Sequence, residues 1–319
     1  HRDLHSFPTR RSSDLRTEYS VGTTIGDSLV VYAGEAVEAA FSDTVFASDG
    51  TWYYRAFACD EFYNYAAGGT QRSIIVYKDA VYVSYTGNDA TGNGTSVAPM
   101  RTIQGGITKA DVLADIHAVR VAGTDSYTTY NYTSATTTTP VVDMISGISV
   151  YGGYSPTDWA ETARDPGTHV SYIGFSADYT AGSGNCVTVN VYDIQDEVVI
   201  DGFMIEGGDA SGAVENLYSV YAYGCEGAVT ISDCVITGGE VDTAGETSAV
   251  FADTCSGGIT VSGCAITGGI NTAGGATYGI NINDCPVVID NNQRIWGGST
   301  PGGISIGIFV NNPTNYDDV

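Results

Sequence analysis

Apolar and polar residues alternate in short runs along the second half of the chain, and these runs recur at a nearly constant interval. One alternating pattern that closes on two glycines occurs four times, at Val198–Gly208, Val229–Gly239, Ile259–Gly269 and Val288–Gly298. Its closing glycines therefore recur at an interval of about 30 residues. A second alternating pattern lies between the copies and begins at Val189, Val220, Val250 and Ile280. Each repeat therefore predicts two short strands that face a shared core.

Coils of about 30 residues that repeat in register describe strands stacked as parallel sheets, roughly 4.8 Å apart. Neither the frame of a leucine-rich repeat nor the four strands of a propeller blade is present. We therefore predict an all-β protein, a single-stranded right-handed parallel β-helix over residues 79–319. The segment from Pro99 to about Ala114 predicts a short N-terminal capping helix. Its inner face is expected to carry Ile103, Ile107 and either Val112 or Leu113.

Cysteines follow the same interval as the strands. Cys225, Cys255 and Cys285 recur once per repeat, and so do Cys234 and Cys264. Side chains in register on stacked strands have parallel Cα–Cβ vectors, which is poor disulfide geometry, whereas a free cysteine packs like a small apolar residue. We therefore favour reduced thiols stacked in the core over disulfides. The spacing also lacks the closely paired ligands of a zinc site.

The part of the chain before Asp79 has a different pattern. We interpret residues 1–15 as an artefact, the translation of a sequencing adapter, and exclude them from the fold. Residues 16–78 contain strand-like runs that predict part of a β-sandwich. The runs are Tyr19–Gly22, Ser28–Tyr32, Thr51–Asp60 and Arg72–Tyr77, with Trp52, Tyr54, Ala56 and Ala58 as the expected inward set. This arrangement resembles the C-terminal half of a fibronectin type III domain.

The start of the predicted solenoid resembles the opening of pectin-lyase-like β-helix proteins, in the segment catalogued there as a domain of unknown function. The similarity lies in Tyr82-Val83-Ser84, the Gly/Asp/Asn loop after it, Arg101–Gln104, Val119–Thr124, and Ile148–Ser155 with Trp159. It covers roughly residues 81–319 and implies the fold of that superfamily, with polysaccharide lyase or glycoside hydrolase activity as a candidate. The last apolar run, Ile304–Val310, starts another coil without a visible cap, so we expect a β-helix truncated at its C-terminus.

Charge narrows the classes of partner. The chain has 12 basic and 37 acidic residues, a net charge of −25, and about −26 once residues 1–15 are set aside. This balance repels nucleic acid and anionic lipid, and no apolar run is long enough to span a bilayer. With 41 Gly and 22 Tyr, the composition is typical of an all-β extracellular protein with tight turns. We expect it to be a bacterial protein that is secreted or held at the cell surface. We expect a monomer whose signal peptide lies outside this sequence.

Carboxylates do not stack on neighbouring predicted coils, which weakens an enzymatic interpretation. Asp201 is followed one coil later by Ser232, and Arg294 has no carboxylate at the equivalent position of the preceding coil. Glycoside hydrolysis needs two carboxylates at a defined separation. We therefore predict a structural, adhesive or carbohydrate-binding module with no required cofactor and no assigned catalytic residue. A polysaccharide lyase or glycoside hydrolase is the alternative.

Two groups of side-chain oxygens are candidate binding residues. The loops after each Gly-Gly pair would stack into an acidic face that could take a polysaccharide or a cell-surface ligand. Its residues are Asp209, Glu215, Glu240, Asp242 and Glu246. In an earlier loop, Asn88, Asp89 and Asn93 offer the hard oxygen ligands that Ca²⁺ prefers. Local hydrogen bonds within that turn are the favoured alternative, because the spacing is not that of an EF-hand.

Overall fold

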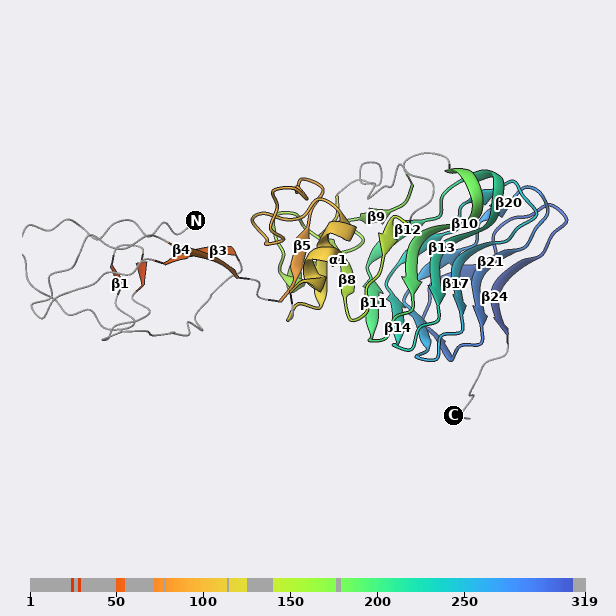
Figure 1. The fold of residues 1–319 in the computed structure, drawn as a ribbon. Coiled ribbons are helices and arrows are strands. Elements are labelled where there is room, and N and C mark those ends of the chain that lie inside the picture. The colour runs from red at the N-terminus through yellow and green to blue at the C-terminus, as the bar shows by residue number, and fades with distance from the viewer. Residues whose placement is uncertain are drawn as a thin grey trace, which may run out of the picture. The chain divides into compact units, whose positions relative to one another are not determined.

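The computed structural model describes residues 79–113, 115–124, 140–175 and 179–311, together with four short strands nearer the N-terminus (Figure 1). The chain divides into two compact units, His1–Lys78 and Asp79–Val319. In the first unit, β1 (Thr24–Ile25) pairs with β2 (Ser28–Leu29) and β3 (Gly50–Tyr54) with β4 (Arg72–Val76), both antiparallel. Three of the four predicted runs thus contain strands. The run Tyr19–Gly22 and the expected inward set lie outside the residues and side chains that are described.

Three parallel sheets form the walls of the second unit, an all-β parallel β-solenoid of about six coils with one α-helix among the described residues. The first sheet contains β5 (Val81–Val83), β6 (Ala118–Ala122), β8 (Ser149–Tyr154), β11 (Val198–Asp201), β14 (Val229–Ser232), β18 (Ile259–Ser262) and β22 (Val287–Asp290). The second contains β9 (Ser171–Ile173), β12 (Phe203–Glu206), β15 (Val235–Thr237), β19 (Ala265–Thr267) and β23 (Arg294–Trp296).

The third sheet is the one that positions the candidate site. It contains β7 (Val142–Asp143), β10 (Tyr179–Tyr192), β13 (Ala210–Tyr223), β17 (Thr247–Asp253), β21 (Thr277–Asn283) and β24 (Ser305–Asn311), with β16 (Glu240–Val241) and β20 (Ile270–Asn271) beside β13. Figure 1 shows these strands stacked side by side toward the C-terminal end of the unit. The predicted parallel solenoid is confirmed.

Residues at equivalent positions form columns along the solenoid. Val198, Val229 and Ile259 pair in series and are buried, as the repeat predicts. The fourth copy was expected to begin at Val288, but Val287 is the residue that pairs with Ile259, and Val288 is 56% exposed. The register shifts because Pro286 alone separates Cys285 from β22, whereas Ser256, Gly257 and Gly258 separate Cys255 from β18.

Left-handed backbone recurs at two corners of each coil. The residues are Asp193, Gly224, Thr254 and Asp284 after the third sheet, with φ from 48° to 66°, and Gly202, Asp233, Gly263 and Asn291 after the first, with φ from 49° to 75°. Glycine, asparagine and aspartate tolerate this conformation best. Thr254 is the β-branched exception, so strain is expected at that corner.

Strict alternation is interrupted in the third sheet. Ser219 and Val220 are consecutive residues of β13, and both are fully buried. The Ser219 hydroxyl reaches across the interior and donates to the carbonyl of Thr237 at 2.8 Å. Thr188 of β10 donates in the same way to the carbonyl of Glu206 at 3.0 Å. Because Ser219 and Val220 both point inward, the alternation of inward and outward side chains shifts by one residue at this point. Tyr218 and Tyr221, which are three residues apart, therefore both lie on the outer face of β13.

Cysteine columns lie inside the solenoid. All six cysteines among the described residues are free and buried. The backbone N–H of Cys255 lies 3.1 Å from the Cys285 sulfur, and that of Cys234 lies 3.5 Å from the Cys264 sulfur. The predicted stacking of reduced thiols is therefore what the structure contains.

The predicted cap is helix α1 (Ile103–Asp111), which begins after Thr102, whose hydroxyl accepts from the Gly105 N–H at 2.9 Å. Its buried residues are Ile103, Gly106, Ile107 and Ala110. Val112 and Leu113 both lie past the end of the helix, with Val112 70% exposed and Leu113 half-buried, so Ala110 completes the face that one of them was expected to share. Within the described ranges, no helix has the length and apolar character needed to cross a bilayer.

Candidate functional site

Aromatic side chains gather on the outer face of the third sheet. Tyr192 and Tyr223 have ring centroids 5.7 Å apart and planes 12° from parallel. Tyr223 and Tyr221 are 6.2 Å apart at 4°, and Tyr221 and Phe251 are 5.4 Å apart at 3°. The strand register pairs Tyr192 with Tyr223 and Tyr221 with Phe251. Four nearly parallel rings therefore run across β10, β13 and β17, and we call them the aromatic row.

The aromatic row is accessible to a ligand. Tyr192 is 57% exposed, and Tyr221, Tyr223 and Phe251 are half-buried. A row of rings on one wall is an apolar surface of the kind that marks a ligand-binding face. The C–H groups of a pyranose ring pack well against such rings, and tyrosine adds a polar hydroxyl at the edge.

A carboxylate lies beside the aromatic row. Glu246, just before β17, accepts from the Tyr218 hydroxyl at 3.0 Å and from the Asn281 amide at 3.4 Å. The Tyr218 ring contacts the row, with its centroid 4.7 Å from that of Phe251. Burial raises the pKa of Glu246, although the hydrogen bonds from Tyr218 and Asn281 oppose the shift. Burial and the nearby Glu246 raise the pKa of Tyr218 far above its usual value, so this hydroxyl stays a donor at neutral pH.

The wall around the aromatic row is acidic. Asp253, at the end of β17, pairs with Tyr223 on one side and Asn283 on the other. Asp193 follows Tyr192 directly, and the only lysine or arginine after Arg164 in the sequence is Arg294, in β23 of the second sheet. The polar groups at this site are thus carboxylates, amides and tyrosine hydroxyls.

The structure separates the five predicted acidic-face residues into two places. Asp209, Glu215, Glu240 and Asp242 are exposed, and Asp209 accepts from the Glu240 N–H at 3.1 Å. They were all expected in loops, but Glu215 lies in β13 and Glu240 in β16. Glu246 instead lies half-buried against the aromatic row. The aromatic row was missed by sequence reasoning. Its signal was present, because one repeat interval separates Tyr192 from Tyr223 and also separates Tyr221 from Phe251.

The predicted Ca²⁺ loop is held by hydrogen bonds. Asn88 Oδ1 accepts from the N–H of Ala90 at 2.8 Å, and Asp89 Oδ1 from the N–H of Arg101 at 2.7 Å. Asn93 Oδ1 accepts from the Thr95 hydroxyl at 2.7 Å. Across the described ranges, no three His, Cys, Asp or Glu side chains converge to hold a metal. These bonds give Asn88 and Asn93 a turn-forming role, whereas Asp89 ties the loop to the start of α1, and Ca²⁺ binding stays a prediction.

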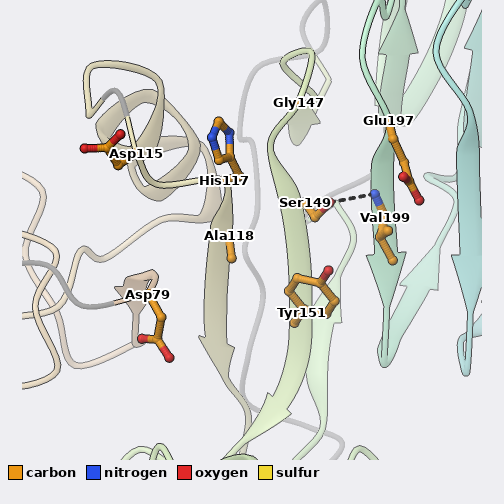
Figure 2. A pocket seen from close by; sticks show the side chains of 9 residues that line it. All are labelled: Asp79, Asp115, His117, Ala118, Gly147, Ser149, Tyr151, Glu197 and Val199. Atoms are coloured by element: carbon orange, nitrogen blue, oxygen red, sulfur yellow. Dashed lines mark hydrogen bonds between the residues drawn. The ribbon is translucent and has the colours of Figure 1, made fainter.

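A shallow depression of about 410 Å³ lies over the first sheet (Figure 2). It is lined by Asp79, Asp115, His117, Ala118, Gly147, Ser149, Tyr151, Glu197 and Val199. The Ser149 hydroxyl accepts from the Val199 N–H at 3.0 Å, and Asp79 pairs with Arg120 at 2.9 Å. Figure 2 shows the carboxylates of Asp79, Asp115 and Glu197 on separate parts of the rim, so they form no convergent acidic pair.

Comparison with protein-family models, curated proteins and solved structures gave no match for this chain. The resemblance to pectin-lyase-like proteins and to fibronectin type III domains therefore stays a prediction. The parallel β-solenoid itself rests on the strand pairing described above.

Proposed function

We propose that the solenoid is a carbohydrate-binding module that holds a polysaccharide against the aromatic row. The observation that carries this proposal is the set of four nearly parallel rings across β10, β13 and β17, with Tyr192 57% exposed. A secreted or cell-surface position, as the composition predicts, would give such a module access to wall or matrix polysaccharides.

The sheet makes this surface rigid before any ligand arrives. Parallel pairing fixes the spacing of the rings along the solenoid, so little conformational freedom is lost when a sugar stacks on them. Polar groups border the rings at the positions where sugar hydroxyls would lie. Glu246 and Asn281 are hydrogen-bonded to each other there, and Asn283 donates to Asn281 at 3.3 Å.

Binding is better supported than catalysis. Along the described strands, no two carboxylates occupy paired register positions: Asp201 pairs with Ser232, and Asp253 with Tyr223 and Asn283. The carboxylate of Asp201 is also held by Arg164 and Ser232. A lyase or hydrolase would need an acid and a base around one bond, whereas packing of a sugar against the aromatic row needs only the rings and their polar neighbours.

The test is polysaccharide binding by variants of the full chain. Wild-type protein, Tyr192→Ala and Phe251→Ala are compared by affinity gel electrophoresis over a panel of soluble polysaccharides. Trp296→Ala is the matched control, because Trp296 is equally accessible at 60% exposure but belongs to β23 on the second sheet. We expect at least about a tenfold loss of affinity for both variants of the row.

The control variant should bind as the wild type does. Failure of the folded wild type to bind any polysaccharide would overturn the proposal. An equal loss in Trp296→Ala would also overturn it, because binding would then not depend on the aromatic row.

A further inference from the structure

We infer that the ligand of the aromatic row is an uncharged glycan and that this wall rejects polyuronates and sulfated polysaccharides. The inference rests on the proposed carbohydrate-binding function and names its ligand class. It comes from the distribution of charge around the rings and from the hydrogen-bonding groups that border them.

The coils that carry the site contain many acidic residues and almost no basic ones. From residue 165 to the end, the sequence has one lysine or arginine, Arg294, whereas aspartate and glutamate recur throughout. A polyanion approaching these coils meets repulsion at long range as well as at contact. An uncharged polymer meets neither.

The aromatic row has its own carboxylates. Asp253 is level with Tyr223, Asp193 adjoins Tyr192, and Glu246 bonds to Tyr218 beside Phe251. Acidic residues thus occupy the position after Tyr192, the position paired with Tyr223, and the contact with Tyr218 beside Phe251. A uronate or sulfate group on a sugar stacked here would be placed near a like charge with no compensating partner.

The strands of the third sheet contain no lysine or arginine that could neutralise an anionic ligand. Proteins that bind sugar carboxylates or sulfates supply arginine or lysine for this purpose. The Arg294 guanidinium lies over the Trp296 ring at 5.1 Å, on the second sheet. A bridging divalent cation would need clustered ligands, and the described residues contain no such cluster.

The groups that are present suit hydroxyl partners. Carboxylates such as Glu246 and Asp253 accept hydrogen bonds, and the amides of Asn281 and Asn283 both donate and accept. Asn281 and Asn283 lie on β21, where they continue the columns of Phe251 and Asp253. An uncharged sugar with several hydroxyl groups can satisfy these partners while its ring stacks on the aromatic row.

The experiment measures affinity for three classes of probe at about 20 mM and about 500 mM NaCl. The probes are uncharged glucan, xylan and mannan oligosaccharides, an oligogalacturonate, and a chitosan oligomer that reports simple attraction of a polycation. We expect an uncharged probe to bind with less than about a twofold change between the two salt concentrations. The oligogalacturonate should not bind at either concentration.

A gain-of-function variant sharpens the test. Asp253→Lys places a cation beside Tyr223 and should create oligogalacturonate binding that disappears at high salt. Asp242→Lys makes the same change of charge in the loop region and should not create it. No gain in Asp253→Lys would contradict the view that charge at the row excludes polyanions.

The outcomes separate this inference from the proposed function. Wild-type binding of oligogalacturonate that Tyr192→Ala abolishes would overturn the inference and leave the carbohydrate-binding function standing. Binding of chitosan alone, lost at high salt, would overturn both, because attraction of opposite charges would then explain the interaction.

Discussion

The backbone N–H of Cys264 donates to Oδ1 of Asn292 at 2.9 Å. The amide of Asn292 in turn donates to the carbonyl of Val261 at 2.9 Å. One coil earlier, the N–H of Cys234 makes the corresponding contact with the sulfur of Cys264. Asn292 therefore occupies the position that Cys234 and Cys264 have in the two preceding coils. Its side chain hydrogen-bonds the coil that contains β22 and β23 to the coil before it.

Replacing Asn292 by alanine should loosen that coil. The change leaves the Cys264 N–H and the Val261 carbonyl without these partners, so we expect the free energy of unfolding to fall by about 1–2 kcal/mol. Urea denaturation measures the loss, and hydrogen exchange should locate it in β22 and β23. Gln293→Ala, at the exposed neighbouring position, is the control and should change stability by less than about 0.5 kcal/mol. Equal losses in the two variants would contradict the role given to Asn292.

A substitution at the left-handed corner of Thr254 should stabilise the protein. The φ of 55° at this corner disfavours a β-branched side chain, so Thr254→Asn should raise the free energy of unfolding by about 0.5–1 kcal/mol. Gly224 has the same place one coil earlier with φ 66°, and a Cβ there would meet nothing within 4 Å. Gly224→Thr should therefore cost about 1–2 kcal/mol through backbone strain alone. Thermal unfolding of both variants is the measurement, and a costless Gly224→Thr would refute the strain argument.

The ion pair of Arg164 and Asp201 should matter more than the other pairs. Their side chains are only 15% and 13% exposed, and Arg164 also donates to the Gly152 carbonyl at 2.7 Å. Arg164→Met leaves a nearly buried carboxylate unpaired and should cost about 3–5 kcal/mol. The double variant Arg164→Met with Asp201→Asn should lose less than the sum of the two single losses.

The comparison for that prediction is the pair of Arg120 and Asp79, where the Asp79 side chain is 47% exposed. Asp79→Asn should cost no more than about 1 kcal/mol, because an exposed pair is screened by water. Chemical denaturation at one pH compares all four variants. A strictly additive double variant would show that Arg164 and Asp201 do not act together.

The stability contribution of Glu246 should depend on pH. Burial raises the pKa of this carboxyl above the usual 4.5, so the folded protein holds the proton more tightly than the unfolded chain does. The stability gained from protonation is fully present below about pH 4.5 and is lost as the pH rises through the raised value. Glu246→Gln imitates the protonated form, so it should unfold at a higher temperature than the wild type at about pH 7.5 and at a similar one at about pH 3.5.

Melting temperatures of the two proteins at both pH values test this prediction. Glu240→Gln, at an exposed position of β16, controls for the general effect of removing one negative charge. A Glu246→Gln difference that does not change between the two pH values would show that burial of the carboxylate has no energetic consequence.

The columns of the core could be predicted from the sequence because each coil repeats the same alternation. Val229 and Ile259 are paired as that pattern requires. Val288 was misplaced because the turn before β22 is two residues shorter, and the turn after it one residue longer, than in the preceding coil, which almost preserves the overall interval. Periodicity counts residues between copies, and it does not detect where within a coil they have been lost or gained.

The aromatic row follows from the repeat interval and from the spacing of two residues between Tyr221 and Tyr223, but the contact of Tyr218 with the row could not be derived from strict alternation. A period of two would put Tyr218 and Tyr221 on opposite faces of β13. The inward pair Ser219–Val220 shifts the phase and brings their rings within 5.2 Å of each other. The shift is visible only in the structure, where both residues are buried and Ser219 makes an interior hydrogen bond. Glu246 was selected as one of several loop carboxylates, and its contact with Tyr218 depends on a loop path that the sequence pattern does not specify.

Because Gly224 and Thr254 lie at equivalent corners of successive coils, one whole coil could be deleted or duplicated as a single segment. Residues 225–254 span one full turn of the solenoid, and both ends of that segment lie at the same corner with similar φ. Loss of the segment in a single genetic step would join Gly224 to Cys255 and leave each remaining column facing an equivalent neighbour. Duplication would extend the wall by the same increment. The length of the third sheet can therefore change in steps of one coil, without redesign of the core.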